Sequence, residues 1–209
     1  MDALSTALFW LDYAAVAVFG AAGALAAARR KHDIITFGFF AAVTGVGGGT
    51  LRDLLIGAPV FWVGRPGYIV TCLIAAAAIW VVGRKPWRFT ALLWLDALGM
   101  AAYTVVGTAK AQSFGAPPVS AIVMGVLTAA FGGIVRDVLA NEPSILLRRE
   151  IYITAALAGS TVFVVLTALG APYWWAGGAG FAAALSIRSG ALLFGWNMPA
   201  FPGAGSTED

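Results

Sequence analysis

The chain has 209 residues, of which 60% are hydrophobic and only 11% are charged, and its net charge is +3. A soluble domain carries about 25% charged residues, so this composition excludes an ordinary soluble globule and indicates an integral membrane protein. The basic residues form no stripe with interleaved aromatic residues, which excludes nucleic acid as a partner and leaves the lipid bilayer as the expected surroundings.

Seven apolar segments follow one another along the chain, and each is predicted to form a helix that crosses the bilayer. Gly and Pro residues and short basic clusters separate them. The predicted segments are Leu8–Ala28, Ile34–Ile56, Gly67–Val82, Ala91–Gln112, Val119–Ala140, Ile151–Leu169 and Trp174–Phe194. The last residues, 197–209, are predicted to form a disordered cytoplasmic tail.

The basic residues are divided unequally between the two predicted sides of the membrane. Arg65 and Lys110 lie near helix ends on one side. The loops after the first, third and fifth segments hold Arg29, Arg30, Lys31, Arg84, Lys85, Arg88, Arg148 and Arg149. Because cytoplasmic loops carry the excess of positive charge, this larger set is predicted to be cytoplasmic. The N-terminus is then outside and the C-terminus inside.

An internal repeat relates the two halves of the chain. A shift of 84 residues without a gap places Arg52-Asp53 on Arg136-Asp137. In the same register Gly48, Gly49, Pro59, Arg65 and Tyr68 fall on Gly132, Gly133, Pro143, Arg149 and Tyr152. Each repeat contains three helices, an odd number, so the two copies lie in opposite orientations across the membrane. The predicted fold is an all-α integral membrane protein with seven transmembrane helices. It comprises an inverted 3+3 repeat, residues 1–83 and 84–170, and one extra helix within 171–196.

Glycines gather inside the second and fifth predicted helices, at Gly47, Gly48 and Gly49 and at Gly132 and Gly133. Each interior glycine costs roughly 1 kcal/mol of helix stability relative to alanine, so the clusters predict a bend or a short unwound stretch. Freed backbone groups at membrane depth are tolerated only where protein or a water-filled cavity satisfies them. Such a break therefore indicates a pathway. The alternative is that the glycines let another helix approach closely.

Two Arg-Asp pairs follow these glycines. Arg52 and Asp53 are adjacent, so they point about 100° apart on a helix and are expected to be poor partners for each other. The pseudo-symmetry suggests a cross-pairing hypothesis, in which Arg52 meets Asp137 and Asp53 meets Arg136. Two roles stay open for the four residues: a structural link between the repeats, or a place beside an aqueous path and its gate.

Other polar residues are secondary candidates. Lys110 ends the fourth helix and either snorkels outward or turns toward a pore. Thr44 and Thr128 are repeat-equivalent residues beside the glycines.

Three further charged residues lie within predicted helices. Asp12 and Asp96 are repeat-equivalent and either satisfy helix starts or pair with an arginine. Arg188 lies near the cytoplasmic end of the seventh helix and is expected to snorkel.

The sequence carries no signature of an enzyme. His32 and Cys72 are each the single residue of their type, which excludes a His or Cys cluster for a metal. The paired carboxylates of an acid–base site are missing. The stretch "GVGGGT", residues 45–50, lacks the following Lys-Ser/Thr of a phosphate-binding loop. No cofactor is expected.

The stretches "GVGGGTLRDLLIG" and "FGGIVRDVLANEPSILLRREIY" resemble bacterial members of the TRIC family, the trimeric intracellular cation channels. The resemblance covers about Leu8 to Phe194. It implies a homotrimer in the bacterial cytoplasmic (inner) membrane, with one pore per protomer lined by the kinked second and fifth helices. Monovalent cations, notably potassium or sodium, would pass, and Arg52 and Arg136 would guard the path. The alternative is a secondary transporter of a small solute such as glycine, because inverted repeats and broken helices are equally typical of transporters.

Overall fold

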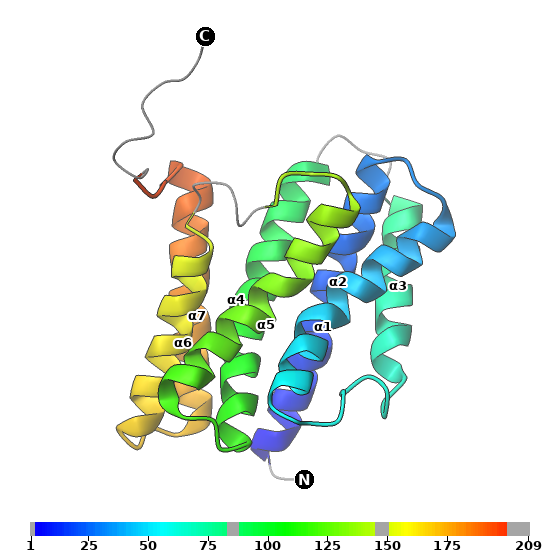
Figure 1. Cartoon of the computed structure of the whole chain (residues 1–209). Coiled ribbons are helices and arrows are strands. Elements are labelled where there is room, and N and C mark those ends of the chain that lie inside the picture. The colour runs from blue at the N-terminus through cyan, green and yellow to red at the C-terminus, as the bar shows by residue number, and fades with distance from the viewer. Residues whose placement is uncertain (1–2, 83–87, 145–150, 200–209) are drawn as a thin grey trace.

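The computed structural model describes residues 3–82, 88–144 and 151–199. These residues form seven helices that stand side by side (Figure 1). The helices are α1 (Ala3–Arg29), α2 (Ile34–Leu55), α3 (Gly67–Val82), α4 (Arg88–Ser113), α5 (Pro118–Leu139), α6 (Ile153–Ala168) and α7 (Tyr173–Phe194). The basic residues predicted at 84–85 and 148–149, and residues 200–209 of the predicted tail, lie outside the described residues.

The helix ends follow from local signals. Asp33 precedes α2, and its Oδ1 accepts a hydrogen bond of 2.8 Å from the backbone N–H of Thr36, as expected of an N-cap. Pro118 starts α5, where a missing backbone N–H costs nothing. Gly195 ends α7 with φ at 65°, a left-handed conformation that glycine adopts without strain.

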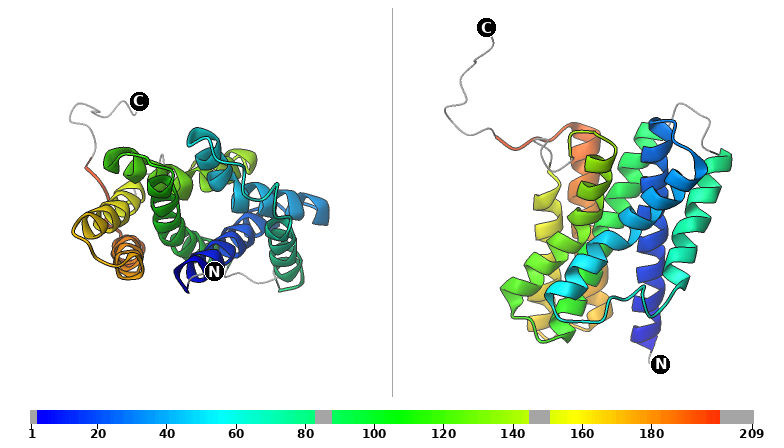
Figure 2. Two further views of the ribbon diagram at one scale, coloured as in Figure 1. Left: turned by 90° about the horizontal axis from the view of Figure 1, so that it is seen from below. Right: turned by 45° about the vertical axis from the view of Figure 1, so that its right-hand side comes forward.

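The two repeats run in opposite directions. In Figure 1, α1 begins at the lower end of the molecule, beside the N-terminus, whereas α4 begins at the upper end. The other two helices of each repeat are reversed in the same way, as the turned view in Figure 2 also shows. The predicted all-α membrane fold with an inverted three-helix repeat and a seventh helix is confirmed.

Five of the seven helices are long and apolar enough to cross a membrane. The other two, α3 and α6, have 16 residues each, which corresponds to roughly 24 Å at 1.5 Å per residue. That is shorter than the hydrocarbon core of about 30 Å, so α3 and α6, as far as the structure describes them, are the two short helices of the seven-helix membrane fold. The two short helices occupy the same position in their repeats, which is a further sign of the internal symmetry.

The core of the molecule lies along α1 and α4. In the membrane-spanning windows of these two helices 61% and 67% of residues are buried, against 28% in α7. The buried residues of α1 include Val16, Phe19 and Leu25, and α4 adds Met100 and Tyr103. The rings of Phe19 and Tyr103 stack with centroids 5.2 Å apart. α1 and α4 therefore form the shared centre around which α2, α3, α5, α6 and α7 pack.

Many large hydrophobic side chains are exposed on the outside of the helix bundle. Ile35, Val81 and Leu169 are among them, with 79%, 78% and 77% of the side chain exposed. Such a surface would aggregate in water but is solvated by lipid tails. The exposed apolar side chains therefore agree with a bilayer as the solvent of this protein.

Candidate functional site

α2 and α5 cross each other at their glycines. A Cβ atom on Gly48 would collide with the carbonyl oxygen of Thr128, and one on Gly132 would collide with the carbonyl oxygen of Thr44. A Cβ on Gly47, beside the crossing, would lie 3.7 Å from the Cα of Gly132. The 84-residue shift exchanges the first two contacts, so the crossing lies at the pseudo-two-fold axis. Only glycine lets two backbones approach this closely.

The second glycine of each Gly-Gly pair, Gly49 or Gly133, faces other groups than the first glycine does. A Cβ on Gly49 would lie 2.6 Å from the ring of Phe61. The nearest atoms to a Cβ on Gly133 belong to the carboxylate of Asp96 and the guanidinium of Arg136, at 3.4 and 3.6 Å. Gly49 and Gly133 therefore make room for groups beside the Arg-Asp motifs.

Both helices are continuous through the glycines. The α-helical residues run without interruption from Ile34 to Leu55 and from Pro118 to Leu139. The predicted short unwound stretch is therefore wrong, because the close contacts of the crossing offset the low helix propensity of glycine. The milder prediction, a bend that keeps the helix intact, stays a prediction.

In each crossing helix, a backbone carbonyl at the repeat-equivalent position accepts a hydrogen bond from a tyrosine hydroxyl. Tyr103 donates a hydrogen bond of 2.7 Å to the carbonyl of Gly45, and Tyr152 donates one of 3.2 Å to the carbonyl of Ala129. The 84-residue shift places Gly45 on Ala129, although the tyrosines come from different parts of the chain. Both crossing helices are thus anchored to the core one turn before the second glycine of the motif.

The Arg-Asp motifs pair within themselves. Arg52 Nε and Nη2 both lie 2.8 Å from Asp53 Oδ1. Arg136 Nε and Nη2 likewise lie 2.8 Å from Asp137 Oδ1. The predicted cross-pairing between the repeats is therefore wrong, and so is the expectation that adjacent residues are poor partners. The long arginine side chain folds back toward its neighbour and so overcomes the angle of about 100° between their positions.

Asp53 joins several parts of the molecule although it is fully buried. Its Oδ1 also lies 2.8 Å from Lys110 Nζ at the end of α4, and its Oδ2 accepts the backbone N–H of Phe61 at 3.0 Å. Arg52 and Lys110 both lie over the ring of Phe61, at 5.7 and 5.8 Å from its centroid. Lys110 therefore turns inward onto Asp53 and does not snorkel outward, and its predicted place beside a pore stays a prediction.

The carboxylates near the starts of α1 and α4 also join these clusters. Asp96 Oδ1 lies 2.7 Å from Arg136 Nη1, and both side chains are 0% exposed. Its repeat-equivalent Asp12 instead accepts a hydrogen bond of 2.9 Å from the hydroxyl of Tyr68. Of the two roles predicted for this pair of aspartates, Asp96 takes the one in which it binds an arginine.

A large cavity of about 760 Å³ opens beside Lys110. Its walls come from the starts of α1 and α7, the end of α4 and the loop between α2 and α3. Asp12, Arg65, Tyr68 and Lys110 supply polar groups, and Phe61 is among the apolar lining residues. This space is large enough to hold many water molecules next to the buried Arg52–Asp53 pair. We refer to it as the outer cavity.

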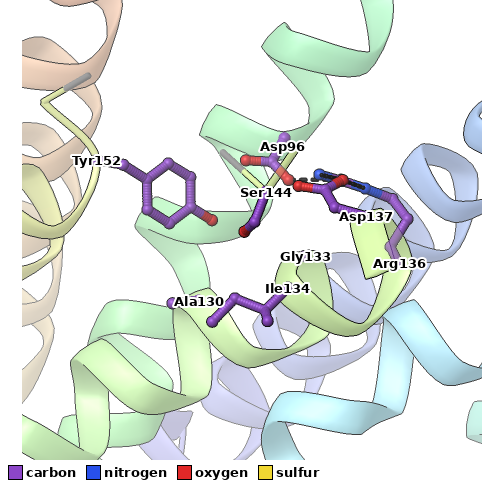
Figure 3. Close-up of a pocket in the computed structure, with 8 residues that line it drawn as sticks. All are labelled: Asp96, Ala130, Gly133, Ile134, Arg136, Asp137, Ser144 and Tyr152. Atoms are coloured by element: carbon purple, nitrogen blue, oxygen red, sulfur yellow. Dashed lines mark hydrogen bonds and ion pairs between the residues drawn. The ribbon is translucent and has the colours of Figure 1, made fainter. Parts of the chain in front are cut away.

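A second cavity lies near the opposite end of the molecule and measures only about 10 Å³ (Figure 3). We refer to it as the inner cavity. Its lining includes Asp96, Arg136, Asp137, Ser144 and Tyr152. Asp96, Ser144 and Tyr152 are the repeat-equivalents of Asp12, Val60 and Tyr68 in the outer cavity. The two cavities are therefore pseudo-symmetric counterparts of very different volume.

Arg188 contributes a further buried charge next to the inner cavity. Its side chain is 0% exposed, and its guanidinium lies over the ring of Tyr152 at 5.1 Å from the centroid. The prediction that Arg188 snorkels toward the membrane surface is wrong. The electron-rich ring face attracts the cation inward, and packing of α7 against α4 and α6 encloses it.

The clustered carboxylates are engaged by basic and hydroxyl groups. Among the described residues no three His, Cys, Asp or Glu side chains gather into a possible metal site. Asp53 and Asp96 accept from lysine or arginine, and Asp12 accepts from tyrosine.

Three residues of these clusters, Tyr68, Tyr152 and Phe61, have roles that the sequence did not predict. Tyr68 and Tyr152 matched in the internal repeat, and that match was a usable signal that both contact the Arg-Asp regions. Phe61 lies in a loop and carried no signal of its own, because its role depends on a backbone N–H and a ring face that only the fold brings to Asp53 and Lys110.

Known proteins with similar sequences extend over most of the chain. A family model described as "Glycine transporter" matches residues 9–84 and again residues 93–168. The second match begins and ends 84 residues after the first, which confirms the internal repeat. A UPF0126 membrane protein of Vibrio cholerae is 38% identical over 95% of this chain and 85% of its own length. The inner membrane protein YadS of Escherichia coli strain K12 is 36% identical over 93% and 96%.

Solved structures agree with this family assignment. The TRIC trimeric intracellular cation channel orthologue from Rhodobacter sphaeroides is 49% identical, with a TM-score of 0.88 over 91% of this chain and all of that chain. A structure described under conductance through TRIC cation channels is 30% identical, with a TM-score of 0.81 over 91% and 95%. With this degree of similarity in both sequence and fold, the chain belongs to the bacterial TRIC family, a family of channels and not of enzymes.

Proposed function

We propose that this protein is a homotrimeric, potassium-permeable channel for monovalent cations, with one path in each protomer. The observation that carries the proposal is the likeness, at 49% identity and a TM-score of 0.88, to a protein described as a trimeric intracellular cation channel. The inverted repeat and the buried charge clusters beside two cavities support it. Sodium is a second expected permeant ion.

The proposed path follows α2 and α5 across the protomer. It enters through the outer cavity, passes the Arg52–Asp53–Lys110 cluster and the glycine crossing, and leaves beside Arg136 and Asp137. The inner cavity of about 10 Å³ has room for about one water molecule at most. In this conformation the path is therefore closed on the inner side.

Cation passage past two arginines requires compensating negative groups. Arg52 and Arg136 are each paired with a carboxylate, so their charge is largely neutralised locally. In addition, α2 ends beside the outer cavity and α5 ends near the inner one. The C-terminal end of a helix carries a partial negative charge, and such ends favour cations in membrane proteins. Each mouth of the proposed path thus receives one cation-attracting helix end.

A planar bilayer with a potassium gradient tests the channel proposal. Purified protein should give unitary currents that reverse near the potassium equilibrium potential. The R. sphaeroides orthologue serves as a positive control for reconstitution. If that control conducts and this protein is silent under the same conditions, the channel proposal fails.

The trimer is tested separately by chemical cross-linking in mild detergent. A ladder that ends at three protomers is expected over a range of protein concentrations. A ladder that ends at two protomers, or that extends beyond three, would contradict the homotrimer.

A secondary transporter of a small solute such as glycine is the second candidate function. The description of the matching family model favours it, and inverted repeats with central charges are frequent in transporters. Vesicles loaded with protein should then show saturable, ion-coupled uptake of labelled glycine. Uptake of this kind in the absence of unitary currents would replace the channel proposal.

A further inference from the structure

A continuous row of aromatic rings runs along the outer cavity. The ring of Phe9 lies 4.8 Å from that of Tyr13, and Tyr13 stacks on Tyr68 with centroids 4.0 Å apart. The ring of Phe61 then meets Tyr68 edge to face at 4.6 Å. We refer to Phe9, Tyr13, Tyr68 and Phe61 as the aromatic wall. It is built from the starts of α1 and α3 and from the loop between α2 and α3, so only the fold assembles it.

A basic side chain lies over the ring at each end of the aromatic wall. The guanidinium carbon of Arg65 lies 5.8 Å from the centroid of Phe9, and Lys110 Nζ lies 5.8 Å from the centroid of Phe61. Both basic residues line the outer cavity. Lys110 is paired with Asp53 at 2.8 Å. Arg65 is exposed and has no carboxylate within ion-pair distance among the described residues, so it presents its charge to the cavity.

The charges around the outer cavity favour an anion with a single charge. Asp12 and Asp53 contribute two negative charges and Arg52, Arg65 and Lys110 three positive ones, which leaves +1. Asp12 is the carboxylate of the described lining, but its Oδ1 is buried and its Oδ2 accepts the hydroxyl of Tyr68. A carboxylate would neutralise the surplus, whereas a phosphate group, with a charge of about −1.5 to −2, would exceed it.

We propose that the outer cavity binds a small aromatic carboxylate, with its carboxylate on the guanidinium of Arg65 and its ring against the aromatic wall. A guanidinium matches the two oxygens of a carboxylate, and aromatic pairs stabilise each other beyond the area that they bury. The volume of about 760 Å³ lies in the range of about 300–1,000 Å³ that is typical of small-molecule sites. The inference goes beyond the proposed function, since binding requires no ion current.

Protection of a cysteine in the cavity lining tests the binding directly. Ser113→Cys, in the lining, and His32→Cys, in the α1–α2 connection, are made separately in a Cys72→Ala background, since Cys72 is the single natural cysteine and is buried. Phenylacetate at about 10 mM should slow thiol labelling at position 113 by about threefold or more, because occupancy lowers the rate by 1 + [L]/Kd. Position 32 should react at an unchanged rate. No slowing at position 113, or equal slowing at both positions, would overturn the proposal.

Matched probes separate the parts of the proposed recognition. Acetate lacks the ring, phenylacetamide lacks the charge, and hexanoate carries the charge on an aliphatic chain, as a lipid-derived acid does. Each should protect position 113 at least about twofold less well than phenylacetate, which is the lower limit of the contribution of an aromatic pair. Equal protection by hexanoate would replace the aromatic acid by a lipid-derived one. Equal protection by glycine would replace it by the solute of the transporter candidate.

Substitutions at the two ends of the proposed contact test the assigned residues. Arg65→Gln should abolish protection by phenylacetate, whereas Arg65→Lys should retain part of it, because lysine keeps the charge without the bidentate geometry. Phe9→Leu keeps an apolar side chain but removes the ring, and should weaken protection by about twofold or more. Rates with and without phenylacetate are compared within each variant, so a direct effect of the lost charge on the reagent cancels.

Arg30→Gln is the matched control, because it removes an arginine charge at the other end of the molecule, where Arg30 contacts Glu142. Protection at position 113 should be unchanged in this variant. Full protection in Arg65→Gln protein, or an equal loss in Arg65→Gln and Arg30→Gln proteins, would overturn the assignment to Arg65. Arg65 is exposed, so its substitution leaves the buried core intact.

The ligand site and the proposed function fail in different experiments. A silent bilayer would remove the channel function and leave the protection at position 113 in place. Potassium currents without any protection at position 113 would remove the ligand site and leave the channel. Where both hold, phenylacetate should lower the current of the parent protein and not that of Arg65→Gln, since the outer cavity is the entrance of the proposed path. A current unchanged at full protection would overturn the place of the acid on that path.

Discussion

At the scale of single residues, Asp53 carries the largest number of polar contacts in the outer cluster. It is fully buried and binds Arg52, Lys110 and the backbone of Phe61. Lys110 is different, because 26% of its side chain is exposed to the outer cavity. The buried residue should therefore decide stability, and the exposed one should act mainly on the passage of ions.

Asp53→Asn and Lys110→Met should differ strongly in their effect on the free energy of unfolding. Asp53→Asn leaves Arg52 buried without its carboxylate and should cost about 3–5 kcal/mol. Lys110→Met leaves the Arg52–Asp53 pair in place and should cost about 1 kcal/mol or less. Thermal unfolding in detergent measures both. A Lys110→Met protein as unstable as Asp53→Asn would contradict this division of roles.

Asp33, outside the membrane-spanning segments, gives a prediction for pH dependence. The hydrogen bond from the backbone N–H of Thr36 lowers the pKa of Asp33 below its usual value of 3.8. A lowered pKa stabilises the fold above the usual value, and the contribution is lost as the pH falls through the lowered pKa. Asp33→Ala should thus destabilise α2 at neutral pH, and its difference from the parent protein should shrink below about pH 3.8.

Thermal unfolding followed by circular dichroism over a pH series measures this effect. Asp33→Asn is the control, because asparagine also caps helices but does not titrate. A difference between parent and Asp33→Ala proteins that stays constant down to pH 2–3, roughly the region below the usual pKa, would show that the carboxylate has no special role as a cap.

At the scale of elements, α2 and α5 are the helices that the glycines make distinctive. Their continuous helical structure shows that the glycines act through the crossing. The Gly48–Thr128 and Gly132–Thr44 contacts are related by the repeat, so this crossing is a symmetric contact between the two repeats, in addition to that of α1 with α4. A rearrangement between the repeats would therefore change this contact as well as that of α1 with α4.

Gly48→Ala and Gly47→Ala form a matched pair of substitutions within one helix. Gly48→Ala places a methyl group against the backbone carbonyl of Thr128 and should destabilise the protein by about 1–3 kcal/mol or more. Gly47→Ala meets only an ordinary contact of 3.7 Å and should be neutral or stabilising by up to about 1 kcal/mol through helix propensity. Thermal unfolding midpoints compare the two, and similar losses would indicate that the crossing tolerates separation.

At the scale of the whole molecule, the inverted repeat gives the two ends different chemistry. Arg29 and Arg30 lie at one end, where both contact Glu142, and the outer cavity opens at the other. The positive-inside rule places the first end in the cytoplasm. The proposed orientation therefore has the N-terminus outside and the outer cavity facing away from the cytoplasm.

Cysteines at exposed positions of the two ends test this orientation in intact bacterial cells. In the Cys72→Ala background, Ser113→Cys lies at the end with the outer cavity and His32→Cys lies in the α1–α2 connection. A membrane-impermeant thiol reagent, applied after permeabilising the outer membrane, should label position 113 directly. It should reach position 32 only after the inner membrane is also permeabilised. The reverse pattern would invert the proposed topology.

The sequence by itself determined the membrane fold and its symmetry, because hydrophobic length and a gapless repeat are properties that a chain carries before it folds. It located the glycines, the two Arg-Asp motifs and Lys110, but it assigned wrong partners to the motifs and wrong surroundings to Arg188. Partners depend on where a flexible arginine side chain finds its nearest buried carboxylate. Such distances are set by the packing of helices far apart in the sequence.

Only the tertiary structure decided the difference between the two halves. Asp96 forms an ion pair with Arg136, whereas its repeat-equivalent Asp12 forms none with Arg52 among the described residues, and the cavities beside the two aspartates differ in volume. A symmetric sequence pattern cannot specify which half is open, because both arrangements satisfy the same pattern. The choice lies in the packing energy of the whole molecule, where one Arg–Asp bond is made and its counterpart is not.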